Sequence, residues 1–317
     1  MRDLAAHGHP VHGYNRSTSG ARSAAKEGFD VSDDLVATLR RAEQDRALLV
    51  IAVPMPGLAP LLDAIAEHAP SCGFTDVISV KAEVYAQVRA RGMADRYVGG
   101  HPMAGTAESG WAASHQGLFT DAAWVITFDH AIDAGEQLSS EWVELWTDVV
   151  RMIILVGAEA IPARVDRHDA AVARISHLPH VLAEALAIVG DEGGALSQSL
   201  AAGSFRDGTR VAGTAPELVR AMCETNAPAL LTALDETLEL LRDAREALAA
   251  DSPDLSELVD AGYRSRIRFD ARQGSRAESV SPVKISSRPV LRLHPGGPGW
   301  INQLIQAESL GGRIEVF

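Results

Sequence analysis

A histidine in a short glycine-rich run is the residue of this chain best suited to catalysis. The run reads Gly99-Gly100-His101-Pro102 and follows a short apolar stretch that predicts the end of a strand. The glycines allow backbone and ligand to approach closely, and Pro102 fixes the backbone and removes a donor. Near neutral pH a neutral imidazole accepts a proton from a hydroxyl group, so this run is suited to general acid–base catalysis. The simpler interpretation is a solvated histidine in an ordinary turn.

Three other runs contain polar residues in a distinctive order. They are Ser79-Val80-Lys81, Ser176-His177-Leu178-Pro179-His180 and Gly203-Ser204-Phe205-Arg206-Asp207-Gly208-Thr209-Arg210. Together with the run around His101 they resemble the active-site runs of the prephenate dehydrogenase family, the NAD(P)-dependent enzymes of tyrosine biosynthesis. The matches stand in the family's order, and the likeness extends over residues 1–270.

The resemblance implies a role for each of these residues. His101 and Ser79 would be catalytic: His101 takes or polarises the proton of the substrate's C4 hydroxyl, and Ser79 hydrogen-bonds that hydroxyl and holds the nicotinamide edge. Arg210 would bind a substrate carboxylate, for which a guanidinium is better suited than an ammonium. His177 would line the pocket and contact the substrate. The other substrate-binding residues that the resemblance implies are Asp207, which would orient Arg210, Gly203 and Thr106.

The same resemblance implies the reaction. Prephenate would give a hydride from C4 to the nicotinamide and lose carbon dioxide, which yields 4-hydroxyphenylpyruvate. Two departures from the family pattern leave arogenate, the amino analogue that would form tyrosine directly, as the alternative substrate. Ala107 stands where some members have an acidic residue, and the run Pro216-Glu217-Leu218-Val219 lacks a tryptophan that many members have.

The elements that must position these residues alternate along residues 1–157. Strands are predicted at 11–15, 47–53, 76–80, 97–100 and 124–128, with helices at 19–28 and 58–69 between them. This alternation predicts an α/β Rossmann-type fold with a doubly wound parallel sheet that binds NAD(P). Pro54, Ser79 and His101 follow strand ends, so we expect them to meet at one edge of the sheet.

The start of this predicted domain is unusual. A dinucleotide-binding unit opens with a strand, a Gly-x-Gly-x-x-Gly turn and a helix. Residues 2–9 are typical of the end of that helix. We therefore expect the first strand and the glycine-rich turn, about 20 residues of such a unit, to be missing from this chain because Met1 is an internal methionine. A naturally inactive cofactor site is the alternative.

The turn after the second strand indicates the choice of cofactor. An acidic residue there would bind the ribose of NAD, whereas this chain has Asn15, Arg16 and Ser17. A guanidinium and a hydroxyl suit a phosphate, so NADP is favoured over NAD. The alternative is an exposed polar turn. Val53, Pro54 and Ser79 complete the predicted cofactor-binding residues.

The second half of the chain is predicted to be helical. Residues 158–270 contain amphipathic helices at 166–189, 196–201 and 216–250, and in the family this part forms an all-α homodimerisation domain. Pro179 should bend the first of these helices. His177 and His180 have no third ligand at motif spacing, so we expect no metal.

Residues 271–317 differ in character from the rest. Residues 275–289 are typical of a linker, and strands at 290–293 and 312–317 flank a helix at 301–310. This β-α-β tail indicates either part of a regulatory ACT-like module or a tail packed on its own subunit.

Composition excludes several other classes of function. The net charge of −13 argues against nucleic acid or an anionic membrane as a partner. The longest aliphatic run, 47–53, is too short to span a bilayer, and two cysteines do not make a disulfide framework. We therefore expect a cytoplasmic protein. A dehydrogenase of small hydroxy acids and a non-catalytic dimer with a degenerate cofactor domain are the alternatives from other classes.

Overall fold

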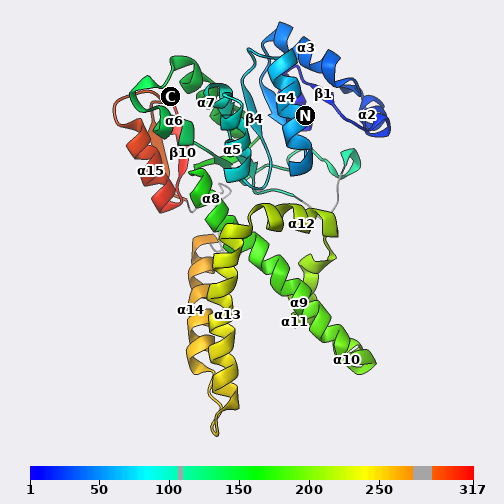
Figure 1. The fold of residues 1–317 in the computed structure, drawn as a ribbon, viewed down its shortest axis with the longest axis vertical. Coiled ribbons are helices and arrows are strands. Elements are labelled where there is room, and N and C mark those ends of the chain that lie inside the picture. The colour runs from blue at the N-terminus through cyan, green and yellow to red at the C-terminus, as the bar shows by residue number, and fades with distance from the viewer. Residues whose placement is uncertain (106–109, 274–287) are drawn as a thin grey trace, which may run out of the picture.

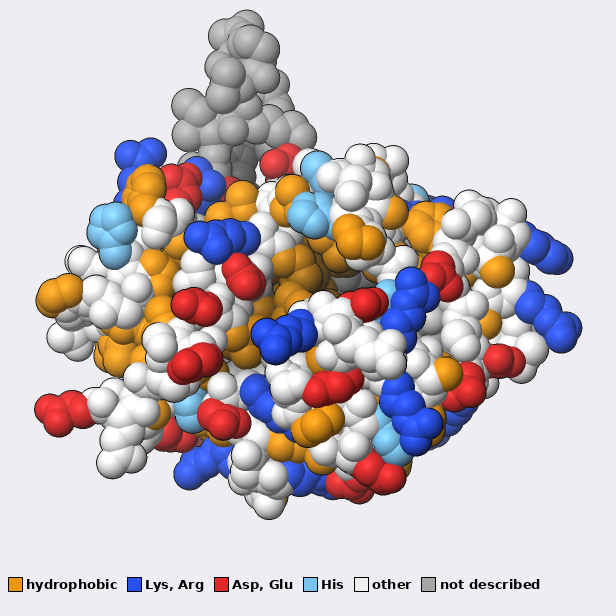
Figure 2. Space-filling view, turned by 90° about the horizontal axis from the view of Figure 1, so that it is seen from above, with side chains coloured by type: hydrophobic (Ala, Val, Ile, Leu, Met, Phe, Trp, Pro, Cys, Tyr) orange, Lys and Arg blue, Asp and Glu red, His pale blue; other side chains and the backbone are white. Residues whose placement is uncertain are grey.

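The computed structural model describes residues 1–105, 110–273 and 288–317. An α/β part lies at one end, and long helices project from it in two directions (Figure 1). Seen from above, the α/β part carries acidic and basic side chains interspersed around an apolar hollow (Figure 2). Thr106, one of the predicted substrate-binding residues, lies outside the described residues.

The described strands within residues 1–162 form three small sheets. β1 (His12–Tyr14) pairs in parallel with β2 (Asp30–Ser32). The parallel order β3-β4-β5 follows, made of Leu49–Ile51, Phe74–Asp76 and Tyr97–Val98. In the third sheet β7 (Ala123–Ile126) lies between β6 (Gly100–Pro102) and β8 (Glu159–Pro162). β6 is antiparallel to β7, where the sequence predicted a wholly parallel sheet, and β8 is parallel to β7.

Helices cover these sheets and enclose two apolar cores. They are α1 (Arg2–Ala6), α2 (Thr18–Ala25), α3 (Leu35–Asp45), α4 (Leu58–His68), α5 (Ala82–Ala90), α6 (Asp129–Ala134) and α7 (Ser140–Leu155). One core gathers Leu58, Leu62 and Phe74 from α4 and β4, and the other gathers Trp142 and Trp146 from α7. Side chains cap several helices: Asp34 Oδ1 accepts from Ala37 N at 2.9 Å at the start of α3.

Two details of the predicted strands were wrong. The strand predicted at 76–80 ends at Asp76, because the Asp76 carboxylate accepts from the Ile78 backbone N–H at 2.8 Å and turns the chain away. The strand predicted at 97–100 is divided at Gly99 between β5 and β6. A Cβ at Gly99 would lie 2.6 Å from Thr127 Oγ1, so only glycine fits where the chain passes from one sheet to the next.

The helical part begins with a bent helix. α8 (Val165–Val172) leads through a π-helical turn (Ala173–His177) into α9 (Leu178–Glu192). Pro179 cannot donate to the Ile175 carbonyl, so the interruption falls where proline predicted a bend. α10 (Gly194–Leu200), α11 (Gly203–Thr209), α12 (Pro216–Thr225), α13 (Ala227–Ala249) and α14 (Ser256–Gln273) complete this part. The single helix predicted at 216–250 is broken at Asn226, two residues before Pro228.

One described segment, Val165–Glu192, is long and apolar enough to cross a membrane by length and composition alone. The same segment is hydrogen-bonded to the α/β part through His168 and Asp169. An apolar helix that one chain leaves largely uncovered is also typical of a helix that packs against a partner subunit.

The tail packs on its own chain, which agrees with the second of the two predicted alternatives. β9 (Val290–Leu293) and β10 (Arg313–Val316) are parallel, and α15 (Trp300–Leu310) connects them. The Trp300 ring meets Trp146 of α7 edge-on at a centroid distance of 5.3 Å. Since its apolar residues share the core of α7, the tail is built into the α/β part. The interpretation as a regulatory module stays a prediction.

Candidate active site

His101 lies at the middle of β6, opposite Val125 of β7. Its Nδ1 atom is 2.8 Å from Nε2 of His168, and the two rings meet edge-on at 74°. His168 is the fourth residue of α8 and is almost fully buried. The strand and the helix are therefore joined through two imidazoles.

Asp169 continues this contact. Its Oδ1 atom is 2.7 Å from Nδ1 of His168. The carboxylate also accepts from the backbone N–H groups of Lys81 at 2.8 Å and Ala82 at 2.9 Å, at the start of α5. Burial raises the pKa of this carboxyl, but the hydrogen bonds from His168 and from the two backbone groups outweigh burial and lower the pKa below its ordinary value. Asp169 is therefore a carboxylate that orients His168.

These contacts fix which ring nitrogens carry protons. A carboxylate accepts from Nδ1–H of neutral His168, which leaves His168 Nε2 as an acceptor. His101 then donates its Nδ1–H to His168, and its own Nε2 is the basic atom. Burial, followed by electrostatic interactions with His168, Lys81 and His177, lowers the pKa of His101 to about 2. His101 is thus neutral near pH 7, as a general base must be.

His177 is connected by hydrogen bonds to the same group of residues, His101, His168 and Asp169. Its Nδ1 lies 3.1 Å from Asn226 Nδ2, which also donates to the Asp169 carbonyl at 2.8 Å. Because the amide donates to Nδ1, the proton of neutral His177 stands on Nε2. Burial lowers its pKa to about 4, although the Asp169 charge opposes the shift. His177 therefore presents an Nε2–H donor and is linked to Asp169 through the side chain of Asn226.

Arg210 and its neighbours lie elsewhere in this chain. Gly203 and Asp207 are exposed on α11, and Arg210 is exposed at the first residue of the turn that follows it. The Arg210 charge acts on His180 of α9, whose pKa burial and this charge both lower. The structure of one chain connects His101 to His177 through His168, Asp169 and Asn226, and it leaves Arg210 at the surface of the helical part.

The predicted cofactor residues follow three strand ends. Asn15 Oδ1 accepts from Ser17 N at 2.8 Å, and Ser17 Oγ accepts from Gly20 N at 3.4 Å, so the turn after β1 caps α2. Arg16 is exposed on this turn. Val53 and Pro54 follow β3, and Ser79 is half-buried in the loop after β4. Polar side chains and backbone donors at strand ends and at a helix start are the chemistry that a dinucleotide requires.

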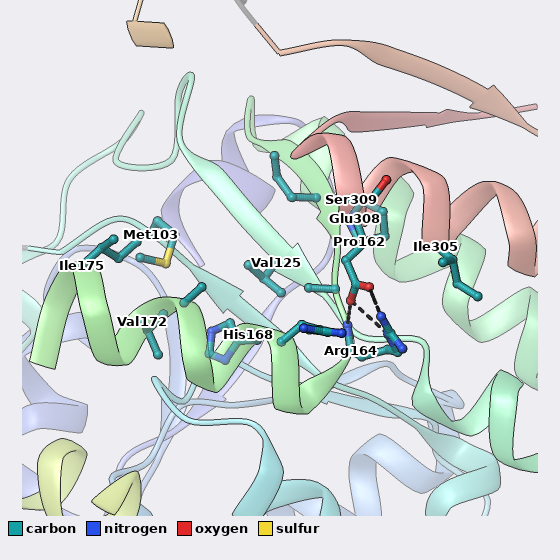
Figure 3. Close-up of a pocket in the computed structure, with 14 residues that line it drawn as sticks. Met103, Val125, Pro162, Arg164, His168, Val172, Ile175, Ile305, Glu308 and Ser309 are labelled. Atoms are coloured by element: carbon teal, nitrogen blue, oxygen red, sulfur yellow. Dashed lines mark hydrogen bonds and ion pairs between the residues drawn. The ribbon is translucent and has the colours of Figure 1, made fainter. Parts of the chain in front are cut away.

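A pocket of about 530 Å³ opens beside His168, between α8, the β7–β8 pair and α15. In Figure 3 Met103 and Ile175 lie at one end of it, and the Arg164–Glu308 ion pair lies at the other. Glu308 Oε1 also accepts from the Arg164 backbone N–H at 2.6 Å, directly before α8. The tail therefore supports the start of the helix that carries His168 and Asp169.

Sequence reasoning missed three residues of this site: His168, Asp169 and Asn226. A His-Asp pair in the first turn of the helix predicted at 166–189 was the available signal. For the metal, the described residues contain no group of three or more His, Cys, Asp or Glu side chains that could hold an ion.

An α/β domain with polar groups at its strand ends and a neutral histidine, joined to a helical domain, is the arrangement expected of a nicotinamide-dependent dehydrogenase. Residues 1–154 match the nucleotide-binding domain of prephenate dehydrogenase, and residues 164–261 match its dimerization domain. The chain belongs to the prephenate dehydrogenase family, as the sequence runs predicted, and its Rossmann-type fold is confirmed.

Three relatives illustrate the similarity. A cyclohexadienyl dehydrogenase of Zymomonas mobilis is 33% identical over 72% of this chain and 75% of its own length. A prephenate dehydrogenase of Bacillus subtilis is 30% identical over 72% of this chain and 60% of its own length. A crystal structure from Corynebacterium glutamicum, whose assignment as a prephenate dehydrogenase is provisional, is 60% identical, with a TM-score of 0.93 over 100% of this chain and 94% of that one.

Proposed function

We propose that this protein oxidises prephenate with NAD(P) and releases carbon dioxide, which forms 4-hydroxyphenylpyruvate. The observation that carries the proposal is the chain of hydrogen bonds from Asp169 through His168 to His101. It leaves Nε2 of a neutral, half-buried His101 as a base for the substrate hydroxyl.

Proton transfer follows from this chain. His101 Nε2 accepts the C4 hydroxyl proton as the hydride departs, and positive charge develops on the imidazole. The Nδ1–H bond to His168 and the carboxylate of Asp169 stabilise that charge, as in a Ser-His-Asp triad. A bound nicotinamide supplies the hydride acceptor. Loss of the ring carboxylate then makes the ring aromatic, and Ser79 would hold the hydroxyl in position.

The proposed cofactor is NADP, held by Asn15, Arg16, Ser17, Val53 and Pro54. Exposed Arg16 and the hydroxyl of Ser17 would bind the 2′-phosphate of its ribose.

The proposed substrate contacts are His177, Arg210, Asp207, Gly203 and Thr106. The donor at His177 Nε2 would meet the substrate, and Arg210 would bind a carboxylate. Arogenate is the second candidate substrate, because a solved structure that is 28% identical to this chain, with a TM-score of 0.65, is an arogenate dehydrogenase of Synechocystis.

We further propose a homodimer formed through the helical domain. Residues 1–157, 158–270 and 271–317 would be the cofactor domain, the dimerisation domain and the linker with its tail. Large apolar side chains of the helical domain stay exposed in one chain, among them Val189, Leu196, Leu241, Val259 and Tyr263. A partner subunit would cover them.

The test is to assay the purified protein with prephenate and arogenate, each with NADP and NAD. The proposal predicts that prephenate supports formation of reduced nicotinamide with one carbon dioxide per turnover. Oxidation of arogenate alone would select the alternative substrate, and no turnover of either would overturn the proposed function.

A further inference from the structure

Lys81 belongs to one of the sequence runs and has no role in the chemistry described so far. It is one of only three lysines among the 29 cationic side chains of the chain. Its side chain is fully buried and pairs with Asp76, whose side chain is also fully buried. A buried charge pair is a weak source of stability, because desolvation of both ions opposes their attraction.

The contacts of the Lys81 side chain lead directly to His101. The Lys81 ammonium donates to Asp76 Oδ1 and, at 2.8 Å, to the carbonyl of Gly100. Gly100 immediately precedes His101 in β6. The position is close-packed, because a Cβ at Gly100 would lie 2.7 Å from the Asp76 carbonyl oxygen. The ammonium therefore holds the backbone of β6 next to the residue that performs the chemistry.

Asp76 strengthens this connection from β4. Its Oδ2 atom accepts from Tyr97 Oη at 2.6 Å and from Gly100 N at 3.4 Å. Oδ1 accepts from Ile78 N at 2.8 Å as well as from Lys81. One carboxylate thus fixes β5, β6 and the loop that carries Ser79.

The backbone of Lys81 contacts the other side of the centre. Its N–H donates to Asp169, which contacts His168, which contacts His101. Together with the Gly100 contact this closes a ring: Lys81, Gly100, His101, His168, Asp169 and again Lys81. His101 is consequently held along its backbone and through its side chain, and both connections start from the same lysine.

We propose that Lys81, with Asp76 as its counter-ion, is a positioning residue that fixes His101 for proton transfer. The proposal rests on the proposed function, in which His101 is the base. Because its side chain is fully buried against Asp76 and the Gly100 carbonyl, Lys81 acts through the backbone next to His101 rather than on a ligand. Loss of its ammonium would let β6 and His101 shift, and displacement of a catalytic group by about 1 Å can lower the rate about 100-fold.

The first experiment compares Lys81→Met with the paired variant Asp76→Asn/Lys81→Met. The single variant leaves the Asp76 carboxylate buried without a counter-ion, which could prevent folding by itself. The paired variant removes both charges and so avoids this cost. Lys26→Met, which changes the exposed lysine directly after α2, is the matched control. We expect kcat for prephenate to fall about 10- to 100-fold in the paired variant, with KM for both substrates within about twofold. Wild-type kcat in a folded paired variant would overturn the proposal.

The second experiment places the paired variant in a His101→Asn background. A residue that acts through His101 loses its effect once His101 is absent, so we expect less than about a threefold further loss of kcat. A full further loss would show a general structural effect and contradict the proposal. Failure of the wild-type enzyme to oxidise prephenate or arogenate would instead overturn the proposed function, so the two failures are distinguishable.

Discussion

Nε2 of His168 lies 2.8 Å from Nδ1 of His101, although 67 residues separate the two along the chain. The contact joins β6 of the nucleotide-binding domain to α8, the first helix of the helical part. The orientation of the catalytic imidazole therefore depends on how these two parts of the chain pack against each other. Asp169 of α8 contributes to this packing, because its carboxylate contacts His168 and also accepts from the backbone at the start of α5 in the nucleotide-binding domain.

His168→Phe should therefore impair catalysis more than binding. The phenyl ring fills the same space but cannot accept the Nδ1–H of His101, so the proton on His101 is no longer fixed and its developing charge is less stabilised. We expect kcat to fall by about 10²-fold with little change in KM for NAD(P). Steady-state kinetics give both constants. Near-normal kcat would remove His168 from the mechanism, and His130→Phe, a histidine of α6, serves as the control.

The buried histidines also predict how stability depends on pH. The folded-state pKa is about 2 for His101 and about 4 for His177, against an ordinary 6.5. Between 6.5 and these lowered values the unfolded chain binds more protons, so each histidine lowers the free energy of unfolding as pH falls, by about 1.4 kcal/mol per pH unit. Above pH 6.5 the contribution is complete. Asp129, with its pKa raised to about 6 by burial, acts in the opposite direction below pH 6.

The His101→Gln variant isolates one of these contributions. Urea unfolding of wild type and variant should be measured at about pH 7.5, 6.5 and 5.5. Below pH 6.5 the free energy of unfolding should fall less steeply with pH in the variant than in the wild type, by the equivalent of about one proton. Parallel pH curves would mean that His101 titrates near its ordinary pKa in the folded protein.

Arg210 is predicted to bind a substrate carboxylate. Arg210→Ala should raise KM for prephenate about 10- to 100-fold, consistent with the loss of a charge-assisted hydrogen bond worth about 1.5–3 kcal/mol. Arg210→Lys should recover only part of that loss. Arg206→Ala, which changes an exposed arginine on α11 just before Arg210, should leave KM unchanged. An unchanged KM in Arg210→Ala would exclude the carboxylate contact.

Cofactor preference is tested at the turn after β1. We expect a higher kcat/KM with NADP than with NAD, and Arg16→Ala should reduce this preference about tenfold through loss of a phosphate contact. Arg22→Ala, exposed on α2, is the control. An enzyme that prefers NAD and does not respond to the Arg16 change would show that the turn serves only to cap α2.

The sequence was informative where the required residues are contiguous. His101 was found because glycines and a proline surround it, and the bend before Pro179 followed from a missing donor. His168, Asp169 and Asn226 could not be found in the same way, because their role arises only when α8 packs against β6 and α5. Likewise, the Asp76 carboxylate that ends the strand by accepting from Ile78 N is also bound by Tyr97 and Gly100, which are remote in sequence. Neither hydrophobic periodicity nor secondary-structure propensity predicts contacts between residues that are remote in sequence.

The most direct test of the central claim is kcat for His101→Asn with prephenate. Asparagine keeps a donor near Nδ1 but lacks the basic Nε2, so kcat should fall by about 10²–10⁴-fold while KM for prephenate stays within a few-fold. A folded variant with near-wild-type kcat would contradict the account, because the proton would then be leaving the substrate by another route.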